Sequence, residues 1–327
     1  MRERSWEATC STCSVSIPRS RGAPEVAAGI AASDPTPGGV GTVTERVVDI
    51  DGIPMSALCA EVAEPRAVVV ALHGGATTSR YFDLPGRPEL SLLRAGAALG
   101  YTVLAPDRPG YGASAPFGDE FDDPARRVDA CYATVDALLG ASPRGAGTFL
   151  LAHSAGCDLG ARMAADPRGA RLLGLELAGT GTVKYADAEQ LITAMRSLGD
   201  RGTIRDLLWY PEDLYPEEVR GGRSLSSRTP RYEATVAVRW PMKFPVLSPD
   251  IRIPVRLSHA EHERVWRTDP DTLDAIARGF TSSPRLVWYR QAASGHNMSV
   301  GFAAGAYHRS VLAFVEECAL ATERPSA

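Results

Sequence analysis

Lysine is almost absent from this 327-residue sequence: Lys184 and Lys243 are the only two, and all other Lys or Arg positions are arginine. Acidic residues outnumber these basic residues by 39 to 35, which gives a formal net charge of −4 and an isoelectric point near 5.9. The sequence therefore lacks the excess positive charge of proteins that bind nucleic acid, and we expect no nucleic-acid partner.

Long hydrophobic runs are absent as well. No stretch approaches the ~20 apolar residues that a membrane-spanning helix needs, and the first residues lack the apolar segment of a signal peptide. We therefore expect a soluble, cytoplasmic protein without a membrane partner. Nothing in the sequence indicates an oligomeric state.

Cysteine is scarce, with six residues in the chain. Cys10 and Cys13 have the spacing of a metal or redox pair, but no second pair and no histidine lies near them, so we expect no metal site. Cys59, Cys131 and Cys157 fall in apolar segments, where cysteine usually acts as a small buried hydrophobic residue.

The N-terminal part of the chain has two distinct regions. Residues 1–41 are rich in Ser, Ala, Gly, Pro and Arg without apolar periodicity, which predicts a disordered extension. Residues 43–50 and 55–62 alternate between apolar and polar positions on either side of Asp51-Gly52. This pattern predicts a β-hairpin.

Apolar runs and helical patterns alternate along the rest of the chain. The expected strands are 67–72, 101–105, 148–152, 171–178, 255–258 and 286–289, and the expected helices are 90–99, 124–139, 155–165, 271–277 and 300–320. Such alternation predicts an α/β fold with a mostly parallel sheet covered by helices. Functional sites in these folds lie at the carboxyl ends of the strands.

Residues 182–250 interrupt this alternation with several prolines and many aromatic residues. About seventy residues are too many for a simple connection, so we expect a mainly helical lid inserted into a core of residues 42–181 and 251–322. We expect part of its aromatic side chains to line the entrance to a substrate site. The candidates are Trp209, Tyr210 and Trp240.

Ser154 lies between a predicted strand and a predicted helix. The small residues Ala152 and Gly156 flank it at two positions before and after, and they allow the chain to turn sharply there. Such a strained turn presents the serine above the sheet beside the helix N-terminus, which predicts a nucleophile. A serine that only caps the helix is the alternative.

Small residues also follow the first buried strand, in the segment His73-Gly74-Gly75. The backbone amide of Gly75, together with that of Ala155, is expected to hold the oxyanion of a tetrahedral intermediate. A glycine-rich turn without this role is the alternative, and His73 is expected to be structural in either case. We expect the loop of residues 107–114 to support the site without taking part in the chemistry.

A histidine that activates a serine needs one ring nitrogen toward the serine and the other toward a carboxylate. His296 follows the last predicted strand and suits this role. The acid is expected after the preceding strand, with Glu263 as first candidate and Glu261 as second. The other histidines in this part of the sequence are His259 and His262, expected on a different loop, and His308, expected within a helix.

Five short motifs resemble those of the α/β-hydrolase superfamily, and they occur in the family's order between about Thr42 and Leu320. The resemblance implies an eight-stranded, mostly parallel sheet and a Ser–His–acid triad. The chain departs from the usual pattern at two positions, with Glu263 in place of Asp and Ala152 in place of the first Gly. The motifs are His73-Gly74-Gly75, Asp107-Arg108-Pro109-Gly110-Tyr111-Gly112, Ala152-His153-Ser154-Ala155-Gly156, Ala260-Glu261-His262-Glu263 and Gly295-His296-Asn297.

This resemblance predicts a serine hydrolase that cleaves a small carboxylic ester or thioester, with a fairly apolar group, through an acyl-enzyme. Serine at position 154 argues against relatives that open epoxides or displace halide with an aspartate. Acyl transfer by serine needs no metal or organic cofactor, so we expect none. Two alternatives remain: elimination or transfer of an acyl group such as acetate in natural-product biosynthesis, and a binding protein without catalysis.

Overall fold

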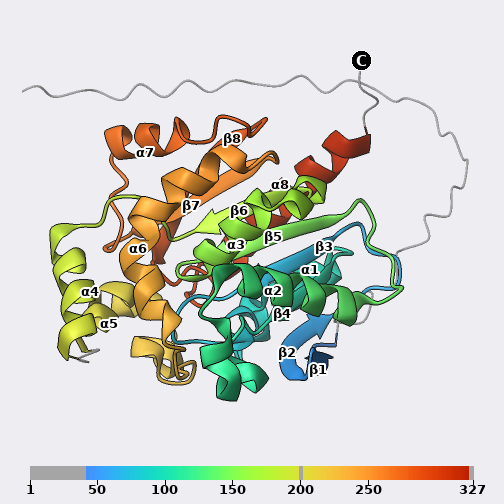
Figure 1. Cartoon of the computed structure of the whole chain (residues 1–327), viewed down its shortest axis with the longest axis horizontal. Coiled ribbons are helices and arrows are strands. Elements are labelled where there is room, and N and C mark those ends of the chain that lie inside the picture. Colours follow the sequence, from blue (N-terminus) through green and yellow to red (C-terminus); the bar gives the residue numbers. More distant parts are fainter. Residues whose placement is uncertain (1–41, 199–201, 324–327) are drawn as a thin grey trace, which may run out of the picture. The chain divides into compact units, whose positions relative to one another are not determined.

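The computed structural model describes residues 42–198 and 202–323 (Figure 1). The predicted N-terminal extension, with Cys10 and Cys13, lies outside the described residues. Cys59, Cys131 and Cys157 are buried free thiols, as predicted.

The chain first forms the predicted hairpin, from β1 (Thr44–Ile50) and β2 (Ile53–Ala60). The two strands pair antiparallel, and the turn residues Asp51 and Gly52 have φ angles of 53° and 82°. Positive φ at both turn positions matches the right-handed twist of the strands, which explains why an Asp-Gly pair stands here. β2 then joins the main sheet by antiparallel pairing with β4.

The sheet has eight strands in the order β1-β2-β4-β3-β5-β6-β7-β8. All pairs from β4 to β8 are parallel, as the alternation of strands and helices predicts. The strands after the hairpin are β3 (Val68–Leu72), β4 (Thr102–Pro106), β5 (Thr148–His153), β6 (Gly174–Ala178), β7 (Val255–His262) and β8 (Leu286–Gly295).

Helices cover both faces of this sheet. On β3, Val68, Val70 and Leu72 belong to one apolar cluster, while Val69 and Ala71 belong to another. This division follows from side chains that alternate between the two faces of a strand. α2 (Pro124–Leu139), α3 (Gly156–Ala165) and α7 (Pro270–Ala277) contribute to the first cluster, and α1 (Leu92–Ala98) and α8 (Ala304–Glu323) contribute to the second.

The largest differences from the predicted boundaries are in β7, β8 and the last helix, and β6 begins at Gly174 rather than at residue 171. β7 and β8 extend beyond 258 and 289, so His259 and His262 lie on a strand rather than on the loop we expected. The register of β7 shifts between Ala260 and His262. Because of this irregularity, the alternation of apolar and polar residues did not show that the strand continues. The last helix begins at Ala304, because turns around residues 297–303 precede it.

The connection between the neighbouring strands β6 and β7 carries the irregular segment 182–250. It contains α4 (Ala186–Leu198), α5 (Gly202–Leu208) and α6 (Tyr232–Leu247), together with short 3₁₀ turns. Its base is tied to the core, because the backbone N–H of Tyr185 donates to the carbonyl of Val265 at 3.0 Å. α4 and α5 lie together, away from β1 and β2 (Figure 1). None of the described helices is both long and apolar enough to cross a membrane.

Candidate active site

Ser154 occupies a sharp turn between β5 and α3, and its φ angle of 51° lies in the left-handed region. Its backbone N–H donates to the carbonyl of Ala178 on β6 at 2.8 Å, which fixes the turn. A methyl group on Gly156 would lie 2.5 Å from the carbonyl oxygen of His73, and one on Gly160 would lie 2.7 Å from the Cβ of Ala152. Small residues are therefore required around Ser154, and alanine meets this need at position 152.

The side chains of Ser154, His296 and Glu263 meet at the carboxyl ends of β5, β8 and β7. Nε2 of His296 lies 2.9 Å from Oγ of Ser154, and its Nδ1 lies 2.9 Å from Oε2 of Glu263. The carboxylate accepts the hydrogen on Nδ1, so Nε2 is left as an acceptor for the serine hydroxyl. The structure thus brings together the three residues that we proposed from the sequence as nucleophile, base and acid.

Glu263 is buried and receives further hydrogen bonds. Its Oε1 accepts from the backbone N–H groups of Val265 at 2.9 Å and Trp266 at 3.3 Å. Burial alone raises the pKa of this carboxyl, but the neighbouring His296 and these amides outweigh it and hold the pKa below its usual value. Glu263 therefore stays ionised at neutral pH.

Glu261, the second candidate for the acid, has other partners. Its Oε1 lies 3.1 Å from a guanidinium nitrogen of Arg290, and its Oε2 accepts from the backbone N–H of Ala293 at 2.8 Å. Of the two glutamates, only Glu263 contacts His296 within the described residues.

The loop that carries His296 is held by the segment 208–215. The side-chain amide of Asn297 donates to the carbonyl of Leu208 at 2.9 Å, and its backbone N–H donates to the hydroxyl of Tyr215 at 3.2 Å. A methyl group on Gly295 would overlap the carbonyl oxygen of Tyr210. The sequence analysis did not identify Tyr215, because nothing in the local sequence shows which loop its hydroxyl reaches.

The side chain of His153 contacts the backbone of His296. Its ring stacks on Tyr81 with centroids 4.6 Å apart, and its Nε2 lies 3.0 Å from the carbonyl oxygen of His296. A carbonyl can only accept, so Nε2 of His153 carries the hydrogen. Burial, reinforced by the nearby His296, lowers the pKa of His153 to about 3. A neutral His153 thus fixes the backbone of the neighbouring histidine, a role that the sequence analysis missed.

Gly75 and Ala155 lie next to each other, since a methyl group on Gly75 would stand 3.5 Å from the Cβ of Ala155. In residues 42–198 and 202–323, neither backbone N–H donates to another protein group. Both residues line the cavity that contains Ser154. These two amides are therefore available to a ligand atom beside Ser154, as an oxyanion hole requires.

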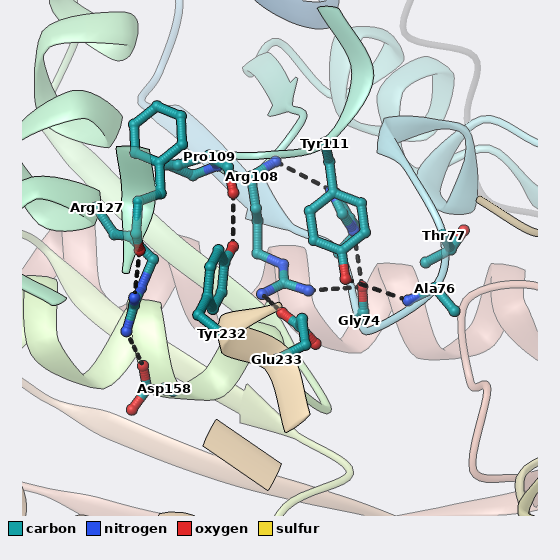
Figure 2. A network of polar contacts seen from close by, with 12 residues as sticks. Gly74, Ala76, Thr77, Arg108, Pro109, Tyr111, Arg127, Asp158, Tyr232 and Glu233 are labelled. Carbon is teal, nitrogen blue, oxygen red and sulfur yellow. Dashed lines mark hydrogen bonds and ion pairs between the residues drawn. The ribbon is translucent and has the colours of Figure 1, made fainter. Parts of the chain in front are cut away.

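The loop before Gly75 is shaped by His73 and Arg108. Nε2 of the buried His73 accepts from the backbone N–H of Arg108 at 3.0 Å, so its Nδ1 carries the hydrogen and donates to the carbonyl of Gly74 at 2.8 Å. Burial and the Arg108 charge lower the pKa of His73 well below its usual value. The Arg108 guanidinium donates to the same carbonyl at 2.9 Å (Figure 2). His73 therefore has the structural role we expected.

A cavity of about 520 Å³ contains Ser154 and His296. The segment 182–250 supplies much of its wall, including Trp209 and Trp240, as we expected. Tyr210 does not line the cavity: the residue is 44% exposed, and its ring lies near Arg264, with the guanidinium carbon 4.9 Å from the ring centroid. Its backbone, rather than its side chain, packs against the histidine loop at Gly295.

Comparison with protein families places residues 69–312 in the Alpha/beta hydrolase family. The chain belongs to this family. Solved structures with the same fold share only 14–19% of their residues with this α/β hydrolase, so they establish the fold and not a substrate. No curated protein matches the sequence.

Three of these structures illustrate the range of activities among proteins with this fold. A thermostable carboxyl esterase from Bacillus coagulans has a TM-score of 0.59 and 15% identity, covering 85% of this chain and 99% of its own. An N-acyl homoserine lactonase complexed with N-hexanoyl homoserine has a TM-score of 0.61 and 15% identity, covering 88% and 100%. A thioesterase domain from the curacin biosynthetic pathway has a TM-score of 0.55 and 19% identity, covering 83% and 99%.

Proposed function

We propose that this α/β hydrolase cleaves a carboxylic ester or thioester through an acyl-enzyme formed on Ser154. The proposal depends on one observation, the continuous hydrogen-bonded series from Glu263 through His296 to Ser154 at the wall of a cavity. A hydroxyl beside a neutral imidazole that is itself bonded to a carboxylate is the arrangement that makes serine a nucleophile.

In the first half of the reaction, Oγ of Ser154 attacks the carbonyl carbon while Nε2 of His296 takes its proton. The ionised Glu263 stabilises the imidazolium that forms. The amides of Gly75 and Ala155 donate to the developing oxyanion. When the intermediate collapses, His296 gives its proton to the departing alcohol or thiol, and the acyl group remains on Ser154.

In the second half, water replaces the alcohol or thiol. His296 takes a proton from the water as its oxygen attacks the acyl-serine, and the same two amides hold the second oxyanion. When this intermediate collapses, His296 gives the proton to Oγ of Ser154, which releases a carboxylic acid and restores the free enzyme. No step needs a metal ion or an organic cofactor.

The cavity supports a small substrate with an apolar part. Its volume of about 520 Å³ lies within the range of small-molecule sites, ~300–1,000 Å³. In this proposal the segment 182–250 acts as a lid whose apolar side chains contact the acyl group. These side chains include Ile192, Leu208, Trp209, Leu225 and Trp240.

A panel of acyl esters of increasing chain length, assayed with the wild type and with Ser154→Ala, tests the proposal. We expect Ser154→Ala to keep its melting temperature and to lose at least ~10³-fold in turnover, the scale of losing a triad member. Product analysis should give an alcohol plus an acid. An alkene plus an acid would indicate elimination instead, and undiminished turnover by Ser154→Ala would contradict the role of this serine.

A further inference from the structure

Glu233, in the first turn of α6, lies in the wall of the cavity that contains Ser154. Glu233 is only 8% exposed, and its Oε1 is held by the guanidinium of Arg108 at 2.6 Å. Its Oε2 has no hydrogen-bond partner in the part of the chain that the structure describes. In Figure 2 one carboxylate oxygen of Glu233 is joined to Arg108, while the other has no partner among the residues drawn.

This unpaired oxygen lies close to the expected oxyanion site. A methyl group on Gly75 would stand 3.0 Å from Oε2 of Glu233. Because position 75 has no side chain, a substrate group can lie between this carboxylate and the backbone of Gly75. Both residues line the cavity that contains Ser154. A group bound to Oε2 therefore lies near the carbonyl carbon that Ser154 attacks.

Arg108 forms a buried ion pair with this carboxylate. The guanidinium is 2% exposed, and the Glu233 charge more than offsets the effect of burial, so the pKa of Arg108 rises above its usual value. The ion pair has no net charge, yet one carboxylate oxygen has no donor among residues 42–198 and 202–323. Glu233 lines the cavity, so a hydrogen-bond donor on a bound substrate can reach the carboxylate oxygen that Arg108 does not hold.

The charges around the cavity favour a neutral donor over a cation. Lys184 and Arg205 line the same cavity. The other acidic residue in its wall, Asp158, already binds Arg162 at 2.9 Å and lies 3.7 Å from Arg127. An ammonium group on the substrate would add positive charge to a site where each carboxylate already has a cationic partner. A hydroxyl group supplies the missing hydrogen bond without this repulsion.

The acyl side of the substrate is the better place for that hydroxyl. The departing group must lie beside His296, which gives it a proton, whereas Glu233 approaches Gly75 on the oxyanion loop. We infer that Glu233 is a specificity-determining residue that accepts a hydrogen bond from a hydroxyl near the carbonyl of the acyl group, so that hydroxyacyl esters or thioesters are preferred substrates. This inference rests on the proposed hydrolase function.

Paired esters of one chain length, with and without a hydroxyl on the acyl group, test the inference. We expect the wild type to have the higher kcat/KM for the hydroxylated member. Glu233→Gln should reduce that preference by about 10- to 100-fold, the scale of a hydrogen bond to a charged group. Equal kcat/KM values for both members with the wild type, or an unchanged preference in Glu233→Gln, would overturn the inference.

Two controls separate this inference from the proposed function. Calorimetric binding of the paired esters to Ser154→Ala measures hydroxyl recognition without turnover, and we expect tighter binding of the hydroxylated member. If Glu233→Gln does not fold, Glu233→Asp can be used instead. Its shorter side chain keeps the charge but moves the carboxylate away from the substrate, so the preference for the hydroxylated ester should fall below that of the wild type. Turnover of both esters without preference would overturn only the inference, whereas no turnover of any ester would contradict the hydrolase function.

Discussion

The Glu263 carboxylate lies 2.9 Å from Nδ1 of His296, whereas the Glu261 carboxylate, two residues earlier, binds Arg290. The register shift in β7 between Ala260 and His262 falls at Glu261, and the strand ends at His262, just before Glu263. Two acidic residues of one motif therefore reach different surroundings, and only one of them can orient the histidine.

Glu263→Gln should lower kcat/KM far more than Glu261→Gln does. An amide in place of the Glu263 carboxylate no longer holds the imidazole in the required tautomer or stabilises the imidazolium, and the matching acid-to-amide change costs ~10⁴-fold in a serine protease triad. Glu261→Gln changes contacts with Arg290 and the backbone of Ala293 but none with His296, and it serves as the matched control. Rates with one ester and melting temperatures of both variants check this, and a larger loss in Glu261→Gln would move the acid role to that residue.

The turn at Ser154 could be predicted from the sequence because it requires small residues at fixed distances from the serine along the chain. Ala152, Gly156 and Gly160 are small for steric reasons that depend on neighbouring strands, but their spacing around one serine is visible in the chain itself. The mostly parallel sheet was predicted in the same way, from alternating apolar runs and helical patterns, whereas the order of its strands was not.

Contacts between distant segments were not readable. The approach of Tyr215 to the His296 loop and that of Glu233 to Gly75 depend on how the segment 182–250 returns over the sheet. For Tyr210, large size and a neighbouring proline suggested a cavity position, but its backbone packs against Gly295 and its ring lies against Arg264. Aromatic character alone does not indicate the direction of a side chain.

Gly156→Ala should destabilise the protein strongly. Its added methyl group would lie 2.5 Å from the carbonyl oxygen of His73 and 2.8 Å from that of Leu72, and backbone atoms cannot move aside as flexible side chains do. Overpacking of this kind costs about 1–3 kcal/mol or more. Gly118→Ala is the control, because its methyl group meets Pro230 at 3.4 Å, an ordinary contact. Equal unfolding free energies in denaturant for the two variants would refute this steric account.

Trp240→Ala and Trp209→Ala should change the preferred acyl chain length, because both side chains line the cavity. The apolar surface of such a side chain contributes roughly 1.5–3 kcal/mol, which corresponds to about ten- to a hundredfold in selectivity. Tyr210→Ala should keep the parent profile, since its ring lies outside the cavity. An ester panel for the three variants measures this, and three unchanged profiles would show that the segment does not set acyl size.

His308 should make the protein less stable in acid. It is fully buried in α8, both ring nitrogens lack partners within the described residues, and burial lowers its pKa to about 3, with Arg309 adding to the effect. The unfolded chain, with a histidine pKa near ~6.5, binds a proton that the native state excludes. The free energy of unfolding therefore falls as pH decreases from ~6.5 toward 3, by at most about 1.4 kcal/mol per pH unit from this residue.

His308→Leu removes this contribution and leaves that of His153, which acts in the same direction. We expect a smaller loss of unfolding free energy between pH 7 and pH 5 in the variant than in the wild type, measured by denaturant titration at both values. Identical losses would show that His308 is not excluded from protonation in the folded state.

Covalent labelling with a fluorophosphonate tests the central claim most directly, because the reagent reports an activated serine without any assumption about the substrate. The wild-type protein should gain the mass of one phosphonyl group, and peptide mapping should locate it on Ser154. His296→Ala should react much more slowly, and Ser154→Ala should not react at all. A folded wild-type protein that gains no adduct, or an adduct that persists in Ser154→Ala, would contradict the assignment of Ser154 as the nucleophile.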